Sequence, residues 1–219
     1  MSSGRQRAIL IAAVLVALGY GWLRGAFDVR AGGTPRAADV ERHANAPGFE
    51  VATLAAGCFW CAEADFEKLD GVVSVTSGYT GGHDAHPTYR TVSRGTTGHT
   101  EAVEIRFDRS VLTYERLLDH FWRNVDPFAA HSQFCDIGDQ YRPALFTHGE
   151  AQRLAADASK ARVEKKFGRP VAVQVAAAGA FYPAEDEHQD YARRNPVRYR
   201  YYRWGCGRDR RLRELWGPS

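Results

Sequence analysis

The heptapeptide Gly57-Cys58-Phe59-Trp60-Cys61-Ala62-Glu63 joins two stretches of different character. The apolar residues 49–56 before it predict a strand, and residues 58–69 predict a helix. Cys58 therefore lies at a predicted helix N-terminus, where free backbone N–H groups and the positive end of the helix dipole favour an anion. We expect a lowered thiol pKa and a nucleophilic sulfur there, with an apolar surface beside it from the two aromatic residues that follow.

Strand-like and helix-like stretches alternate through the rest of the chain. The predicted strands are residues 72–79, 101–107 and 171–177, and the predicted helices are residues 114–122, 150–167 and 185–194. Residues 124–142 are polar and rich in turn formers, which predicts a long functional loop. This order predicts an α+β fold. We expect a ferredoxin-like α/β sandwich in which a mixed sheet carries packed helices and long irregular loops.

The first 27 residues differ from the rest. Arg5 and Arg7 precede a charge-free run, residues 8–23, that Arg24 closes. A basic start followed by an apolar run predicts an export signal or an N-terminal membrane anchor over residues 1–27. The body is then expected to be exported, either periplasmic or anchored to the membrane and facing the periplasm, which is an oxidising compartment.

Three further segments follow along the chain. Residues 28–47 contain glycines and prolines without periodicity and predict a linker. The folded domain is expected to follow over residues 48–196, and residues 197–219 are a predicted basic C-terminal arm that carries Cys206. With 44% hydrophobic and 25% charged residues the composition is that of an ordinary globular protein.

The formal charge of +3 is unevenly distributed. Residues 193–219 hold nine arginines and two acidic residues, whereas the remainder of the chain has a net charge of −4. A basic arm can bind nucleic acid or phospholipid, but no nucleic-acid-binding motif and no nucleotide fingerprint accompanies it. We expect arginines that pair with the acidic body, no nucleic-acid partner and no cofactor.

Glu101 opens the second informative stretch. Alternation along the predicted strand places it on the same face as Val103, Ile105 and Phe107. A carboxyl group on an apolar face should have a raised pKa, and a carboxylic acid that stays neutral can donate a proton. The alternative is that Glu101, at the start of the strand, turns into solvent.

Five motifs together resemble one family. They are Gly57-Cys58-Phe59-Trp60 with Glu63, Gly78-Tyr79-Thr80-Gly81-Gly82, Pro87-Thr88-Tyr89-Arg90, Gly98-His99-Thr100-Glu101 and Gln140-Tyr141-Arg142. In this order the set is similar to peptide methionine sulfoxide reductase A over about residues 48–196. Each motif alone is weak evidence, but five in sequence are specific.

The resemblance implies a role for each residue. Cys58 would attack the sulfur of methionine-S-sulfoxide, free or in proteins, and Glu101 would protonate the sulfoxide oxygen. Tyr89 and Tyr141 would hold that oxygen, and Asp136 would position the site from the loop. Phe59 and Trp60 would bind the substrate methyl group. The products would be methionine and a Cys58 sulfenic acid.

Turnover then requires a second thiol. We favour Cys206, because Arg203 and Arg208 near it would stabilise its thiolate and because the resemblance implies a C-terminal resolving cysteine. Cys61 and Cys135 are the alternatives. The resemblance further implies that a thioredoxin-type partner reduces the disulfide, and we expect a monomer.

Two rival functions remain at this point. A thioredoxin-like disulfide oxidoreductase would use Cys58 and Cys61 as its redox pair. A structural zinc site could combine the cysteines with His83, His86 or His99, although one Cys-x-x-Cys without a second pair is poor spacing. We expect no metal, with His83 and His86 in a solvated turn and His188 on a solvent-facing helix.

Overall fold

The computed structural model describes residues 48–218 of the 219-residue chain. The predicted segments 1–27 and 28–47 lie outside the described residues. Within residues 48–218 no helix has both the length and the apolar character needed to cross a membrane.

Six strands form one sheet in the order β7-β6-β1-β3-β2-β8. The strands are β1 (Phe49–Ala55), β2 (Val72–Thr80), β3 (Thr100–Asp108), β6 (Ala144–Thr147), β7 (Gln174–Ala177) and β8 (Tyr182–Pro183). All neighbours are antiparallel except β6 and β7, which are parallel, so the sheet is mixed as predicted.

The central four strands have ferredoxin-like connectivity. β1 is followed by α3 (Phe59–Phe66), β2 pairs with β3, and α5 (Tyr114–Arg123) leads to β6. The spatial order of these strands is β6-β1-β3-β2, which is the βαββαβ arrangement. The predicted α+β sandwich is confirmed, and α6 (Glu150–Phe167) adds the crossover to the parallel edge strand β7.

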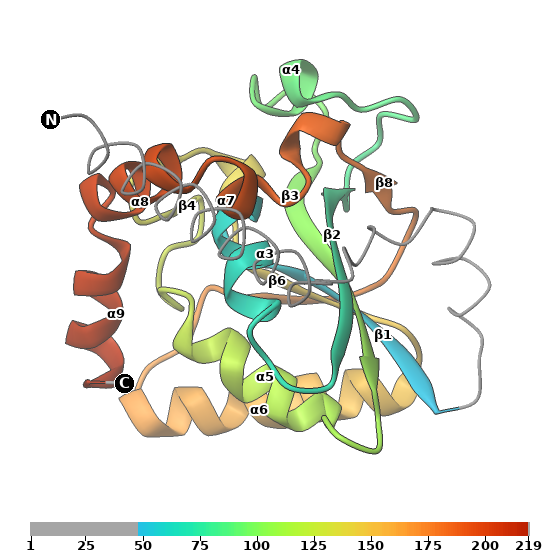
Figure 1. Ribbon diagram of the computed structural model, residues 1–219. Coiled ribbons are helices and arrows are strands. Elements are labelled where there is room, and N and C mark those ends of the chain that lie inside the picture. Colours follow the sequence, from blue (N-terminus) through green and yellow to red (C-terminus); the bar gives the residue numbers. More distant parts are fainter. Residues whose placement is uncertain (1–47, 219) are drawn as a thin grey trace, which may run out of the picture. The chain divides into compact units, whose positions relative to one another are not determined.

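The main core lies between one face of the sheet and the helices α3, α5 and α6, with α5 and α6 side by side (Figure 1). Strand β3 contributes its predicted apolar face, because Val103, Ile105 and Phe107 are fully buried. Helix α5 begins as predicted, with the Thr113 hydroxyl accepting a hydrogen bond from the Arg116 N–H at 3.3 Å. Helix α6 ends at Gly168, whose φ of +66° is the left-handed conformation typical of a helix C-terminus.

The polar loop of residues 124–142 contains short regular elements. They are the hairpin β4 (Ser132–Gln133) and β5 (Asp136–Ile137) and the 3₁₀ turn η1 (Asp139–Tyr141). The amide of Gln133 makes two hydrogen bonds of 2.9 Å with the backbone of Asp126, which fixes the shape of this loop. The loop therefore carries Cys135, Asp136 and Tyr141 on an ordered frame.

The C-terminal third differs most from the sequence prediction. The helix expected over residues 185–194 is divided into η2 (Asp186–His188) and α7 (Tyr191–Arg194), because Asp190 between them is left-handed with φ of 54°. An aspartate tolerates this conformation better than most residues. Residues predicted as an arm form α8 (Pro196–Gly205) and α9 (Arg208–Trp216). Strand β6 and the short helix α4 (Tyr89–Val92) had no sequence prediction.

Candidate active site

Cys58 is the N-cap of helix α3, directly after strand β1 and Gly57. Gly57 has φ of +84°, and a Cβ atom there would lie 2.5 Å from the Cβ of Gln133. Only glycine allows the 124–142 loop to pack this closely against the turn. The predicted position of Cys58 at a helix N-terminus is therefore observed. The loop of residues 124–142 packs against the turn that precedes this helix.

The free N–H groups of this helix end meet a carboxyl group. The backbone N–H of Phe59 donates a hydrogen bond of 2.9 Å to Oε2 of Glu101. Glu101 is only 1% exposed, so its side chain points inward rather than into solvent. The carboxyl group of Glu101 is thus bound to the backbone of the residue that directly follows Cys58.

Burial raises the pKa of Glu101 to about 8, although the Phe59 hydrogen bond acts in the opposite direction. The charges of Asp136 and Cys61 add to the increase. At neutral pH the carboxyl group is therefore mostly protonated and can donate its proton to a bound oxygen atom.

The thiol pair differs from the sequence prediction. Burial, followed by a hydrogen bond and the charges of Cys61, Glu101 and Asp136, raises the pKa of Cys58 well above its ordinary value. The expected lowering by the helix end is wrong for the resting protein, because Cys58 is only 6% exposed and has acidic neighbours. The hydrogen bond from Cys58, helped by Arg208 and Arg203, lowers the pKa of Cys61 to about 7 despite burial.

Two tyrosines border the same space. Tyr89 starts α4 and Tyr141 ends η1, and both are half-buried. Burial raises the pKa of Tyr89 to about 12, and burial raises that of Tyr141 as well, with the charge of Glu101 as the next cause in each case. Both phenols keep their protons and can donate hydrogen bonds toward Glu101's side of the site.

Glu185 holds Tyr89 in place. Its Oε1 accepts a hydrogen bond of 2.8 Å from the Tyr89 N–H, and its Oε2 accepts one of 2.8 Å from the Tyr79 hydroxyl. Sequence reasoning missed Glu185, because an acidic residue in a polar run gives no sign of which tyrosine it contacts.

An aromatic cluster surrounds the first turn of α3. Phe59 is fully buried and stacks with Tyr89 at a ring-centroid distance of 6.3 Å. Trp60 is partly exposed and lies flat on Tyr191, with ring centroids 3.7 Å apart. Tyr202 of α8 closes the cluster edge-on to Trp60. Phe59 and Trp60 thus form an apolar surface beside Cys58, as the heptapeptide predicted.

His188 is part of this cluster, and the prediction that it faces solvent is wrong. It is only 8% exposed, and its Nδ1 accepts a hydrogen bond of 3.2 Å from the Trp60 indole N–H. The left-handed Asp190 separates η2, which carries His188, from α7. Burial lowers the pKa of His188, so the ring remains a neutral acceptor.

Replacing His188 by Phe should test this contact. The Phe ring keeps the stacking with Tyr89 but leaves the Trp60 indole N–H without an acceptor. We expect the free energy of unfolding to fall by about 0.5–1.5 kcal/mol, the net contribution of one hydrogen bond, because Trp60 is partly exposed and water can reach it. Denaturant unfolding followed by tryptophan fluorescence measures the change, and an unchanged midpoint would contradict the assignment.

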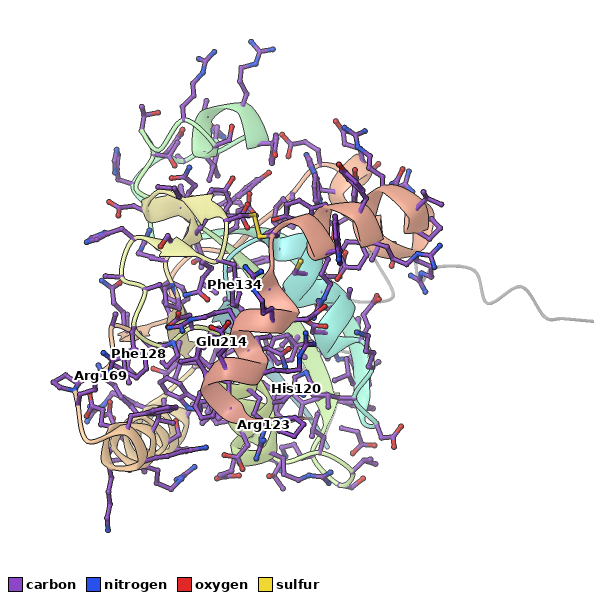
Figure 2. The ribbon with its side chains drawn as sticks, turned by 90° about the vertical axis from the view of Figure 1, so that its left-hand side faces the viewer. His120, Arg123, Phe128, Phe134, Arg169 and Glu214 are labelled. Carbon is purple, nitrogen blue, oxygen red and sulfur yellow. A yellow bond between two sulfur atoms is a disulfide. The ribbon has the colours of Figure 1, made fainter. Side chains whose placement is uncertain are left out.

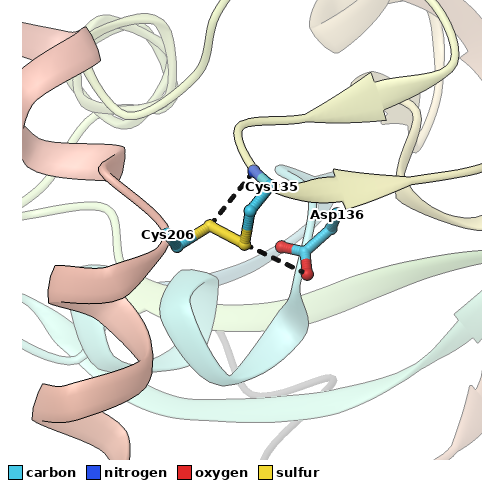
Figure 3. A group of neighbouring side chains, drawn as sticks. All are labelled: Cys135, Asp136 and Cys206. Atoms are coloured by element: carbon cyan, nitrogen blue, oxygen red, sulfur yellow. Dashed lines mark hydrogen bonds between the residues drawn. A yellow bond between two sulfur atoms is a disulfide. The ribbon is translucent and has the colours of Figure 1, made fainter.

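Asp136 and the remaining cysteines form the outer side of the site. Cys135 and Cys206 are joined by a disulfide with a Cα–Cα distance of 5.0 Å (Figure 3). Cys58 and Cys61 are free thiols. Asp136 Oδ2 accepts a hydrogen bond of 2.7 Å from the Tyr202 hydroxyl. The disulfide crosses from the loop that carries Phe134 to the helices of the C-terminal segment (Figure 2).

One group of three potential metal ligands occurs within residues 48–218, namely Cys135, Asp136 and Cys206. Two of its three ligand atoms are the sulfurs of the disulfide, so the oxidised protein offers only the carboxylate. His83 and His86 are exposed as expected, whereas His99 is buried and makes hydrogen bonds to Gly82 and Asp84. The zinc site considered above has no support in this geometry.

Known proteins are similar in sequence to this chain over most of its length. The sequence model of the family described as peptide methionine sulfoxide reductase matches residues 50–219. The peptide methionine sulfoxide reductase MsrA of Bacillus licheniformis is 47% identical over 170 residues, which are 77% of this chain and 94% of the relative. That of Listeria innocua is 48% identical over 161 residues, 73% of this chain and 91% of the relative.

A longer relative shares the same region. The Vibrio cholerae protein named peptide methionine sulfoxide reductase MsrA/MsrB is 46% identical over 173 residues, 78% of this chain. The matched part is 46% of that relative, so this chain spans about half its length.

Solved structures agree with the sequence comparisons. The reduced form of Mxr1 from Saccharomyces cerevisiae matches with a TM-score of 0.66 and 33% identity over 69% of this chain and 88% of that one. Methionine sulfoxide reductase A of Corynebacterium diphtheriae matches with a TM-score of 0.63 and 33% identity over 70% and 78% of the two chains. Together with the buried acid beside the thiol, these matches establish that the chain belongs to the peptide methionine sulfoxide reductase A family.

Proposed function

We propose that this protein reduces methionine-S-sulfoxide, free or in proteins, to methionine and so repairs oxidised proteins. The observation that carries the proposal is the buried, protonated Glu101 bonded to the N-terminus of the helix that Cys58 caps. A sulfoxide oxygen leaves only after protonation, so an acid must face the attacking sulfur. Membership of the family supports the same reaction.

The first step uses the residues of the turn. The Cys58 sulfur attacks the sulfoxide sulfur, and Glu101 gives its proton to the oxygen. Tyr89 and Tyr141 hold that oxygen by their hydroxyl groups. The S–O bond to the substrate breaks, methionine leaves, and Cys58 carries the oxygen as a sulfenic acid. Phe59 and Trp60 bind the substrate methyl group on their apolar surface.

The second stage returns Cys58 to a thiol. The Cys206 thiol attacks the sulfenic sulfur, which forms a Cys58–Cys206 disulfide and releases water. Cys135 then attacks Cys206, Cys58 leaves as a thiol, and the Cys135–Cys206 disulfide remains. The pairing of Cys135 with Cys206 and the free Cys58 support this order. Because Cys135 is exposed, a thioredoxin-type dithiol can reach the final disulfide.

A single-turnover assay tests the function. Reduced protein mixed with one equivalent of a methionine sulfoxide peptide and no reductant should convert that equivalent to the methionine peptide. Peptide mapping by mass spectrometry should then find the Cys135–Cys206 disulfide. Reduced protein that leaves the S-sulfoxide peptide unchanged would reject the proposal.

Two serine variants should separate the roles of the outer cysteines. Cys206→Ser should complete one turnover and accumulate the Cys58 sulfenic acid, detectable with a sulfenic-acid probe. Cys135→Ser should complete one turnover and accumulate a Cys58–Cys206 disulfide. A Cys58–Cys61 disulfide in the Cys206 variant would instead make Cys61 the resolving residue.

We further infer an exported monomer that faces the periplasm and contacts the membrane only through its N-terminal segment. The basic, charge-free and linker segments of residues 1–47 support the inference. Fractionation of cells that express the full chain or residues 28–219 tests the location, and sedimentation tests the monomer. Full-length protein found in the cytoplasm would contradict export.

A further inference from the structure

Two arginines bracket the turn between α8 and α9 that carries Cys206. We call residues 202–208 the resolving turn; Arg203 lies three residues before Cys206 and Arg208 two residues after it. The side chain of Arg203 is 16% exposed and that of Arg208 is 2% exposed, although both are charged. Arg203 of α8 also pairs with Asp209 of α9 at 2.7 Å. The two helices are therefore linked by an ion pair across the turn.

Both arginines reach one buried carboxylate, that of Asp65, whose side chain is 4% exposed. Nη1 of Arg203 donates hydrogen bonds of 3.0 and 2.9 Å to Oδ1 and Oδ2 of Asp65. Nε of Arg208 lies 3.8 Å from the same Oδ2. Burial opposes ionisation of Asp65, but the charges of Arg208 and Arg203 outweigh it and lower the pKa of this carboxyl group. Helix α3, which Cys58 caps, thus holds the resolving turn at both ends through one anion.

Further contacts place the resolving turn on both sides of Cys58. Nη1 of Arg208 donates a hydrogen bond of 3.3 Å to the carbonyl of Ala56, two residues before Cys58. At the other end of the turn, Tyr202 packs edge-on against Trp60, two residues after Cys58, with ring centroids 6.0 Å apart. The turn therefore lies against the start of α3.

The same turn is fixed to the loop that carries Cys135. The ring of Phe134, directly before Cys135, covers the guanidinium group of Arg208, with its centroid 4.5 Å from Cζ (Figure 2). Cys135 itself is bonded to Cys206 (Figure 3). The resolving turn thus contacts the surroundings of both partners that Cys206 takes in the proposed reaction, Cys58 and Cys135.

We propose that Asp65 is a positioning residue for the resolving step, because it holds the Cys206 thiol beside Cys58 through Arg203 and Arg208. The inference rests on the proposed reductase reaction. In the resolving step the Cys206 sulfur bonds to the sulfur of the Cys58 sulfenic acid. The S–O bond breaks, and the hydroxyl group leaves as water with the proton of the Cys206 thiol.

The benefit of this anchor is entropic. A thiol on a flexible segment meets its partner at a millimolar effective concentration, whereas an oriented group reaches a far higher one because its freedom is already lost on folding. Cys206 takes no part in methionine formation, so Asp65 should affect the second step and not the first. A residue that only stabilised α3 would affect both steps, since α3 also carries Cys58.

Asp65→Asn tests the inference in a single turnover of reduced protein with one equivalent of methionine sulfoxide peptide. Chromatography of the peptide follows the first step, and trapping of the Cys58 sulfenic acid with a sulfenic-acid probe at timed intervals follows the second. We expect methionine formation at the wild-type rate and a sulfenic acid that persists about 10²-fold longer, the usual cost of a displacement of about 1 Å. Arg203→Gln, which frees one end of the resolving turn, should lengthen the lifetime in the same direction.

Lys68→Gln is the matched control. Lys68 donates a hydrogen bond of 3.0 Å to Oδ1 of Asp65, but its side chain is 68% exposed and it lies outside the resolving turn. It removes one positive charge from the same carboxylate and should keep the wild-type sulfenic-acid lifetime.

Two results would overturn the inference, namely an unchanged sulfenic-acid lifetime in folded Asp65→Asn or an equal lengthening in Lys68→Gln. If Asp65→Asn does not fold, Arg203→Gln decides by the same two measurements. Wild-type protein that forms no methionine would instead reject the proposed function, so the two failures are distinguishable.

Discussion

Replacing Cys58 by Ser should abolish methionine sulfoxide reduction to the background rate, even in a single turnover with excess enzyme. The serine hydroxyl keeps the shape of the helix N-cap, so the α3 turn and its contact with Glu101 should remain. It lacks the nucleophilicity of sulfur and cannot take the oxygen as a sulfenic acid. Release of methionine peptide, followed by chromatography, measures the loss.

Cys135→Ser is the matched control for this variant. It also exchanges one sulfur for oxygen, but Cys135 acts after methionine has left. Its first turnover should proceed at the wild-type rate. Methionine formation by Cys58→Ser would assign the attack to Cys61, the neighbouring buried thiol, and would overturn the role given to Cys58.

Strand parity and motif order predicted the centre of the site from sequence. Alternation along residues 101–107 placed Glu101 on the same face as Val103 and Ile105. It left open whether the carboxyl group is buried or turns into solvent, and the structure shows that it is buried. The apolar run before Gly57 and the helix after it placed Cys58 at a helix end. These are local patterns. They predict structure well where one face of a strand or helix is buried and the other face is not.

The parts that failed depend on contacts between distant residues. His188 lies 128 positions from Trp60, and no periodicity indicates the left-handed Asp190 that divides the expected helix. Arg208 reads as one arginine in a basic arm, yet its partners Ala56 and Asn124 are 152 and 84 positions away. The predicted lowering of the Cys58 pKa was wrong for the same reason. Burial by distant parts of the chain raises this pKa and outweighs the helix dipole.

Replacing Glu101 by Gln should slow methionine formation by about 10² to 10⁴-fold, the contribution of a general acid. The Gln carbonyl oxygen can still accept the Phe59 N–H, so the helix end and the fold should be preserved. The amide can donate a hydrogen bond to the sulfoxide oxygen but cannot transfer a proton to it. The loss should therefore appear in the single-turnover rate constant rather than in substrate binding.

The pH profile identifies the acid independently of the size of this loss. Only protonated Glu101 is active, so the wild-type rate should fall tenfold per unit as pH rises above about 8, the pKa to which burial raises the group. Glu101→Gln has no titrating proton there and should lack this decline, whereas Glu101→Asp should keep one. If the decline above pH 8 persists in Glu101→Gln, another group is the acid, and the phenol of Tyr89, whose burial raises its pKa to about 12, titrates too high to be that group.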